Sequence, residues 1–513
     1  MGNIITSASA KSPVGAKLYG QDALGNHGWM PPESVAANNR RGNTVVLLGD
    51  SLTSRSNYPM SITSITSSGT TATVNAPSHG LATGDFATIN GATQTEYNGD
   101  YYITKIDTNN FSYTFAGSAT SPATGNITGI TQSSLMTLGM FCWMNATLNG
   151  ALRLLANYGQ SGASADDVYS MVDRALVHRP AIVFVLAGIN SLTGGLSVDS
   201  IYLSIANACD KLRNNGVYVA IQTVTPLGSG HASNASLYPK ICALNSKLKH
   251  YTQVNRGTVL IDAYNALVDP LSTSGAAMAG VLQSDNLHWA QVGAKLVGAA
   301  AAAAISWIVG NTSKTLCISA ADIYHAANPK ALLDNPFFLG TGGALQSGAT
   351  GTVATGWTCY GLGSADTIVA GTGGTPGAAR SDGYGNDQLM TVTSTALADG
   401  VLLYSGDLSA RVSPGDFCYA EADVSAADLS ACIGYYIRAS MTNTDGSIFY
   451  STAPMVPALG DFDQADWSGV LKTPIFKIPS GGITAMAFQF RALFSEAGGG
   501  VFKIGRAQIR KVD

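Results

Sequence analysis

Residues 44–53 have the sequence Thr-Val-Val-Leu-Leu-Gly-Asp-Ser-Leu-Thr, an apolar run that ends in glycine, aspartate and serine. A short run that is apolar at nearly every position is typical of a parallel strand buried on both faces. Later runs at 181–186, 217–221 and 259–262 are of the same kind. Helical patterns lie between them, such as 164–178, where apolar residues share one face behind a capping serine. This alternation predicts an α/β fold, a parallel sheet flanked by helices on both sides.

The chain is too long for one ordinary domain, because single cores stop growing at roughly 250–300 residues and this chain has 513. Two segments show strand-like alternation without helical patterns: one interrupts the α/β region and one follows it. The predicted domains are an N-terminal arm or adaptor (1–40), the α/β domain (41–59 and 134–310), an inserted small β module (60–133), a linker (311–330) and a C-terminal all-β sandwich (331–513).

The composition and net charge of the chain limit the classes of partner and cofactor that we expect. Charged residues make up 12% of the chain and the net charge is −4, so no electrostatic footprint for nucleic acid is expected. The seven cysteines are widely spaced without a C-x-x-C pair, which indicates neither a disulfide framework nor a zinc site, and we predict no metal and no cofactor. The N-terminus lacks the apolar core of a secretory signal. The apolar, alanine-rich stretch 290–310 is interpreted as a buried helix, so no membrane is expected as a partner.

Four short blocks carry the residue types that ester hydrolysis requires: a nucleophile, a base, a carboxylate that orients the base, and donors for an oxyanion. Ser51 directly follows the first predicted strand, at the edge where ligands of open α/β sheets bind. The other blocks are Asn-x-Gly-x-Ser-Gly at 157–162, Gly-Ile-Asn at 188–190 and Asp-Asn-Leu-His at 285–288. In their order and residue types these blocks resemble those of the SGNH (GDSL) hydrolases.

The resemblance implies an SGNH-type serine esterase, a carboxylic ester hydrolase. Ser51 is then the nucleophile, His288 the base and Asp285 the carboxylate that orients it. The oxyanion hole is formed by the backbone N–H groups of Ser51 and Gly162 together with the side-chain amide of Asn190. Two features depart from the family pattern: Ser191 stands where an acidic residue usually follows, and the inserted β module lengthens the chain between the first and third blocks.

Trp289 follows the predicted base. Packing of its ring at the start of a helix is the favoured interpretation, and lining a sugar-binding subsite is the alternative. Asp285 and His288 alone do not make a metal site, because no third ligand is placed by spacing.

Two further resemblances concern the additional domains. Residues 79–81, 97–99 and 111–115 resemble a β module that recurs in bacteriophage tail and other virion proteins. Residues 335–338 and 356–357 resemble parts of jelly-roll domains that bind carbohydrate. A purely structural or trimer-forming sandwich is the alternative for this C-terminal region.

The catalytic blocks do not fix the substrate, because one fold serves many chemistries. With the additional domains, they imply removal of O-acetyl groups from bacterial surface polysaccharide, either capsule or O-antigen, by a phage tail fibre or tailspike. The expected partners are the acetylated polysaccharide and other virion tail proteins, with a homotrimer as one assembly. The expected location is the virion, acting at the bacterial surface. The alternatives are a lipase or thioesterase, and a receptor-binding adhesin without catalysis.

Overall fold

The structure is a computed structural model. It describes residues 18–21, 27–30, 42–309, 317–363, 367–370, 379–380, 385–397, 399–455 and 462–512. The chain divides into two compact units, Met1–Ser54 with Ala151–Thr312 and Arg55–Gly150 with Ser313–Asp513. Of the predicted arm at 1–40, only the antiparallel pair β1 (Leu18–Gln21) and β2 (His27–Met30) is described, and the rest lies outside the described residues. Of the predicted linker at 311–330, residues 311–316 lie outside them too.

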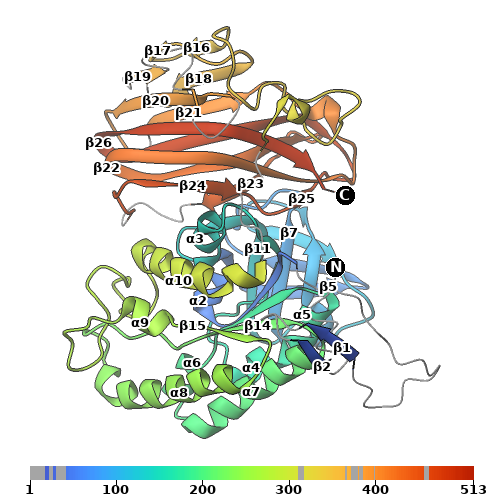
Figure 1. Cartoon of the computed structure of the whole chain (residues 1–513). Coiled ribbons are helices and arrows are strands. Elements are labelled where there is room, and N and C mark those ends of the chain that lie inside the picture. Colours follow the sequence, from blue (N-terminus) through green and yellow to red (C-terminus); the bar gives the residue numbers. More distant parts are fainter. Residues whose placement is uncertain are drawn as a thin grey trace. The chain divides into compact units, whose positions relative to one another are not determined.

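The first unit is built on a five-stranded parallel sheet, which confirms the predicted α/β class (Figure 1). In spatial order its strands are β12 (Arg153–Asn157), β3 (Thr44–Leu48), β13 (Ile182–Val185), β14 (Tyr218–Gln222) and β15 (Thr258–Ile261). Four of the five come from the apolar runs. The sequence pattern missed β12, whose residues are only partly buried over its first half.

Helices follow the strands of this unit. They are α2 (Ser51–Ser54), α4 (Ala165–Ser170), α5 (Val172–Val177), α6 (Ile189–Thr193), α7 (Val198–Asn214), α8 (Asn234–Val254), α9 (Ala263–Leu267) and α10 (Gln291–Val309). The helix predicted over 164–178 forms as two helices that meet at Met171. Ser164 caps the first of them in a reciprocal capping box with Asp167, as its position before the apolar face predicts.

Helices cover both faces of the parallel sheet. Side chains of one face, such as Val46 and Val219, share a core with Ile205 of α7 and Leu244 of α8. On the opposite face the Tyr218 ring contacts Trp307 of α10, with ring centroids 6.0 Å apart.

Helix α10 is long and apolar enough to cross a membrane by length and composition alone, a test that core helices of soluble proteins also pass. One side of it is buried within the first unit, including Val297, Ala301 and Ile305. This burial fits the interpretation of the alanine-rich stretch as a core helix.

The C-terminal part of the second unit is β-rich, as predicted. Its strands are β16 (Ala344–Gln346), β17 (Ala349–Gly351), β18 (Trp357–Gly361), β19 (Thr367–Ala370), β20 (Asp387–Ser394), β21 (Gly400–Ser405), β22 (Phe417–Asn443), β23 (Ile448–Met455), β24 (Trp467–Lys472), β25 (Phe476–Lys477) and β26 (Ile483–Lys511).

Two long strands organise this region. β22 and β26 pair antiparallel along most of their length, with register shifts between Ala427 and Gly434. One half of β26 pairs with β21 and the other with β20, while the two halves of β22 pair with β23 and β24. Side chains from both halves, such as Val424, Ile437, Phe490 and Phe502, lie in one hydrophobic core. The irregularity therefore lets each long strand serve two sets of partners around a single core.

The inserted segment belongs to the same compact unit as the C-terminal region. Its elements are β4 (Asn57–Ser61), β5 (Ser64–Ser68), β6 (Thr71–Asn75), β7 (Phe86–Ala92), β8 (Gly99–Tyr102), β9 (Thr104–Lys105), β10 (Asn110–Thr114), β11 (Gly125–Met136) and α3 (Met140–Thr147). β11 pairs in parallel with β23, and Trp143 of α3 contacts Trp467 of β24 with ring centroids 5.9 Å apart. The structure thus groups residues 55–59 and 134–150 with the C-terminal region, whereas the sequence pattern assigns them to the α/β domain.

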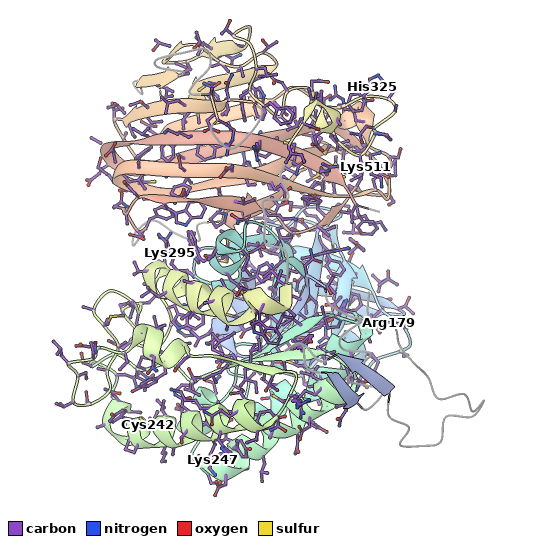
Figure 2. The ribbon with its side chains drawn as sticks, in the orientation of Figure 1. Arg179, Cys242, Lys247, Lys295, His325 and Lys511 are labelled. Atoms are coloured by element: carbon purple, nitrogen blue, oxygen red, sulfur yellow. The ribbon has the colours of Figure 1, made fainter. Side chains whose placement is uncertain are left out.

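All seven cysteines are free. Six are buried, and Cys242 is exposed on α8, where Lys247 also lies (Figure 2).

Candidate active site

Ser51 is the first residue of α2 and follows β3 after a two-residue turn. Gly49 forms this turn, and a Cβ atom there would lie 2.1 Å from Oγ1 of Thr53, so a side chain does not fit. The amide of Ser54 donates to the carbonyl of Asp50 at 2.9 Å and closes the first helical turn. The turn therefore places Ser51 at the carboxyl end of a central strand, the edge where open α/β sheets bind ligands.

His288 and Asp285 reach Ser51 from the loop before α10. His288 Nε2 lies 2.8 Å from Ser51 Oγ, and His288 Nδ1 lies 2.6 Å from Asp285 Oδ2. The two ends of this loop are joined by a hydrogen bond, in which the Gln283 amide donates to the carbonyl of His288 at 2.8 Å. The structure thus joins the three residues that the sequence predicts as nucleophile, base and carboxylate into one chain of hydrogen bonds.

The carboxylate of Asp285 is held in its ionised form. Burial alone would raise its pKa, but hydrogen bonds from the His288 side chain and from the His288 and Leu287 amides outweigh burial and lower the pKa to about 2. An ionised Asp285 accepts a hydrogen bond from the N–H at Nδ1 of His288. Nε2 then carries no proton and can accept the hydroxyl hydrogen of Ser51.

This arrangement predicts the pH dependence of ester hydrolysis. The rate should rise with pH through one ionisation, because the imidazole of His288 must be neutral to act as a base. Asp285 does not contribute to that limb, since it stays ionised down to about pH 2. The measurement is kcat/KM for a small acetyl ester between pH 4 and 9. A rate that is flat between pH 5 and 8 would contradict a histidine base.

The second and third sequence blocks pack beside the first. Asn157 Nδ2 donates to the Thr53 carbonyl at 3.0 Å, and a Cβ atom on Gly159 would lie 2.2 Å from the Ser54 amide nitrogen. Asn190 Nδ2 donates to the carbonyl of Ala163, the residue after Gly162, at 3.0 Å. The predicted oxyanion donors Gly162 and Asn190 therefore come from adjoining segments in the unit that holds Ser51. Their role as donors stays a prediction.

Two residues hold the site together in ways that the sequence prediction did not assign. Ser191, which replaces the usual acid, is buried and its Oγ accepts the amide hydrogen of Ala165 at 2.9 Å. Asn245 of α8 binds both backbone groups of Val224, at 2.8 and 2.9 Å, in the loop after β14. Buried side chains that pair with backbone groups from distant segments leave no periodic signal in a sequence, which is why they were missed.

The structure agrees with the packing of Trp289 and contradicts the alternative, a contact with sugar. Its side chain is 1% exposed and ranks among the largest fully buried side chains of the described chain. Residue 289 also forms a β-bridge with Leu282 at the base of the catalytic loop. The ring packs under the loop and is not accessible to a sugar.

Asp50, directly before Ser51, is completely buried. Its Oδ1 accepts the amide hydrogen of Leu52 at 3.0 Å, and its Oδ2 has no hydrogen-bond partner among the described residues. Burial raises the pKa of Asp50 to about 7, although the Leu52 amide opposes the shift. The carboxyl group therefore binds a proton in the folded protein under conditions where the unfolded chain has released it.

This shift predicts how stability depends on pH. Between about pH 4 and 7 the folded state keeps a proton that the unfolded state loses, so the contribution of Asp50 to stability falls as pH rises. Asp50→Asn removes that loss and should stabilise the protein, relative to the wild type, increasingly from pH 4 to 7 and constantly above. The measurement is the difference in Tm between Asp50→Asn and the wild type at each pH in this range. Asp269→Asn is the control, since Asp269 also accepts a hydrogen bond from a backbone amide. A difference that is independent of pH would contradict the account.

Among the residues that the structure describes, no group of three or more His, Cys, Asp and Glu side chains is arranged to hold a metal ion. Asp285 and His288 therefore belong to no such group.

The sequence and the structure of the chain were compared with those of known proteins. No family model and no curated protein matches the chain. Among solved structures, it is similar to a lipolytic protein of the G-D-S-L family from Desulfitobacterium hafniense (15% identity, 51% of this chain and 99% of that chain covered, TM-score 0.31). It is also similar to a GDSL-like lipase from Bacteroides thetaiotaomicron (19% identity, 31% and 78% covered, TM-score 0.27).

A third similar structure is the enzymatically active domain of tailspike protein 4 from bacteriophage CBA120 (12% identity, 31% of this chain and 20% of that chain covered, TM-score 0.21). TM-scores below 0.5 do not establish an activity, so the activity has to follow from the geometry of the site.

Proposed function

We propose that this chain is a serine ester hydrolase that removes O-acetyl groups from bacterial surface polysaccharide. The observation that carries the proposal is the hydrogen-bonded series Ser51, His288 and Asp285, with spacings of 2.8 and 2.6 Å. A serine hydroxyl next to an imidazole that is itself oriented by a carboxylate is the arrangement that activates serine as a nucleophile.

The reaction follows from these contacts. His288 Nε2 takes the hydroxyl proton while Ser51 Oγ attacks the ester carbonyl, and Asp285 stabilises the imidazolium that forms. The tetrahedral oxyanion is held by the amides of Ser51 and Gly162 and the side chain of Asn190, each donor contributing about 2.7–4 kcal/mol. The imidazolium protonates the departing alcohol. Water then attacks the acyl-enzyme with His288 again as base, which releases acetate and restores the Ser51 hydroxyl.

The proposed bond is an ester and not a glycosidic bond. Glycosidic cleavage commonly uses two carboxyl groups on either side of the sugar. The carboxylate of Asp285 is instead committed to His288 and to two backbone amides. The polysaccharide should therefore lose acetate and keep its chain length.

A polymeric sugar substrate is supported by one face of the C-terminal sheet. Arg438 lies with its guanidinium 3.9 Å from the centre of the Tyr450 ring and 5.8 Å from that of Tyr436, and its Nε donates to Gln489 at 2.7 Å. Tyr436 is buried and the other three side chains are partly buried. All four lie opposite the core face of the same strands, which includes Ile437. Planar rings beside amide and guanidinium donors offer stacking and hydrogen bonds to a sugar.

The proposed setting is a phage tail fibre or tailspike, with other virion tail proteins as partners and a homotrimer as one assembly. It rests on the resemblance of residues 79–115 to modules of virion proteins. The pairing of this segment with the C-terminal region, where β11 meets β23, supports a β-rich accessory unit next to the enzyme in sequence.

The test uses a panel of acetylated capsules and O-antigens, with acetate release and polymer size as readouts. We expect acetate from at least one polymer, no shortening of its chains, and neither change with Ser51→Ala. Hydrolysis of long-chain acyl esters in preference to acetylated polymers would favour a lipase or thioesterase. Binding to polymer without release of acetate would favour an adhesin.

A further inference from the structure

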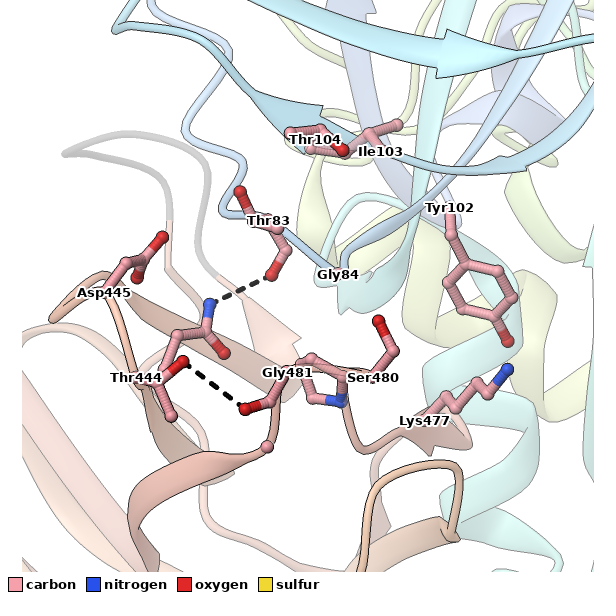
Figure 3. A pocket seen from close by; sticks show the side chains of 13 residues that line it. Thr83, Gly84, Tyr102, Ile103, Thr104, Thr444, Asp445, Lys477, Ser480 and Gly481 are labelled. Atoms are coloured by element: carbon pink, nitrogen blue, oxygen red, sulfur yellow. Dashed lines mark hydrogen bonds between the residues drawn. The ribbon is translucent and has the colours of Figure 1, made fainter.

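A second site lies in the compact unit that does not contain the catalytic residues. It is a pocket of about 280 Å³, close to the roughly 300 Å³ at which ligand pockets begin. Residues 83–84 and 102–104 of the inserted segment form one wall (Figure 3). Residues 443–445, 477 and 479–482 of the C-terminal region form the other. The sequence prediction treats these segments as separate domains, so it contains no such pocket.

The two walls are fastened to each other. Asn443 Nδ2 donates to the carbonyl of Thr83 at 3.0 Å, a contact between residues 360 positions apart. Gly84, at φ +97°, approaches Pro479 so closely that a Cβ atom would lie 2.8 Å from its Cγ. On the second wall, Thr444 Oγ1 donates to the Gly481 carbonyl at 3.4 Å. The pocket is therefore held open by contacts within its own walls.

One end of the pocket combines an aromatic ring with a cation. Tyr102 is 44% exposed and rests on Phe86, with ring centroids 4.8 Å apart. Lys477 Nζ lies 4.9 Å from the centre of the Tyr102 ring, and Figure 3 shows the two side chains next to each other. No carboxylate among the described residues lies within ion-pair distance of this ammonium. A ligand carboxylate would supply the missing counter-charge.

The rest of the pocket offers hydrogen-bonding groups. Figure 3 shows Asp445 at the end away from Lys477, with Thr444 and Ser480 on the same wall. Asn443 is 5% exposed, and its Oδ1 has no hydrogen-bond partner among the described residues. A buried acceptor of this kind is costly unless it is satisfied, and a hydroxyl group is a donor that can satisfy it.

We propose that this pocket binds an acidic sugar unit, a saccharide that carries a carboxylate. The carboxylate pairs with Lys477, the apolar face of the sugar ring lies against Tyr102, and hydroxyl groups donate to Asp445 and Asn443. The pocket holds one sugar unit of the polysaccharide while Ser51 acts on another unit of the same polysaccharide. The choice of a polysaccharide rests on the proposed function, but binding at this pocket does not require hydrolysis.

The test measures binding of small, defined sugars to the full-length protein by saturation-transfer NMR and titration. The probes are the methyl glycosides of glucuronic, galacturonic and mannuronic acids and their neutral counterparts glucose, galactose and mannose. At least one uronide should bind, about fivefold or more tighter than its neutral counterpart, because only the acid can pair with Lys477.

Two variants test the residues. Tyr102→Ala should weaken uronide binding about tenfold or more, and Lys477→Met should abolish the preference for the acid over the neutral sugar. Tyr169→Ala is the matched control, because Tyr169 is 41% exposed and has Lys211 Nζ 5.6 Å from its ring centre. This control should bind as the wild type does.

The outcomes separate this proposal from the proposed function. Ser51→Ala should lose ester hydrolysis and keep uronide binding, while Tyr102→Ala and Lys477→Met should keep hydrolysis of a small acetyl ester. Failure of all three uronides to bind would overturn the proposal, and so would equal binding by Tyr102→Ala and the wild type. Equal affinity for acid and neutral sugars would overturn the role of Lys477.

Discussion

Ser51→Ala is expected to lower kcat for a small acetyl ester about 10⁶-fold, the size of effect seen when a triad nucleophile is removed. The reason is chemical, because the substitution removes the oxygen that lies 2.8 Å from His288 Nε2. The structural cost is small: one hydrogen bond is lost, worth about 0.5–1.5 kcal/mol. The measurement compares steady-state hydrolysis and thermal unfolding of the variant and the wild type.

The control for this variant is Ser236→Ala, since Ser236 is an exposed serine on α8 whose hydroxyl donates to a nearby carbonyl at 3.0 Å. It should leave both activity and Tm unchanged. Turnover by Ser51→Ala above a few per cent of the wild type, in protein that is still folded, would contradict the assignment of Ser51 as nucleophile.

Asp285→Asn should lower kcat/KM about 10³- to 10⁴-fold near neutral pH. The new amide can donate to His288 Nδ1, which would place the imidazole proton on Nε2 and leave that atom unable to accept from Ser51. The carbonyl oxygen of the new side chain can still accept the Leu287 and His288 amides, each now 3.0 Å from Oδ1 of Asp285. The loop should therefore keep its fold, and the loss should appear in the rate.

Asp269→Asn provides the control for this substitution as well, since Asp269 accepts the Leu271 amide at 2.9 Å but lies outside the catalytic series. Its activity should equal that of the wild type. An Asp285→Asn variant that loses less than about tenfold would show that His288 does not depend on an ionised partner for its orientation.

The parallel sheet could be predicted because its strands are local signals. β3, β13, β14 and β15 are apolar at almost every position, and this pattern depends only on burial on both faces. β12 was missed because its apolar run is only three residues long, between Arg153 and Asn157. The grouping of the inserted segment with the C-terminal region depends on contacts such as Trp143 with Trp467, which no local pattern contains.

The catalytic residues could be proposed from the sequence because four short blocks carry the residue types that ester hydrolysis needs and resemble, in their order, those of the SGNH hydrolases. Their supports could not, since Ser191 and Asn245 act through hydrogen bonds to backbone groups of Ala165 and Val224. Trp289 follows the base in sequence, but its side chain is buried, so only the alternative role as a sugar contact is wrong. Adjacency in sequence does not determine which way a side chain points.

The most direct test of the central claim, that Ser51 is an activated nucleophile, is covalent labelling by a fluorophosphonate followed by peptide mass spectrometry. Ser51 Oγ attacks phosphorus, fluoride leaves, and the serine proton passes to His288. The account predicts one phosphonyl adduct on the peptide that contains Ser51, lost in Ser51→Ala and strongly slowed in His288→Ala. An adduct on another serine, or equal labelling of Ser51 in the wild type and in His288→Ala, would contradict it.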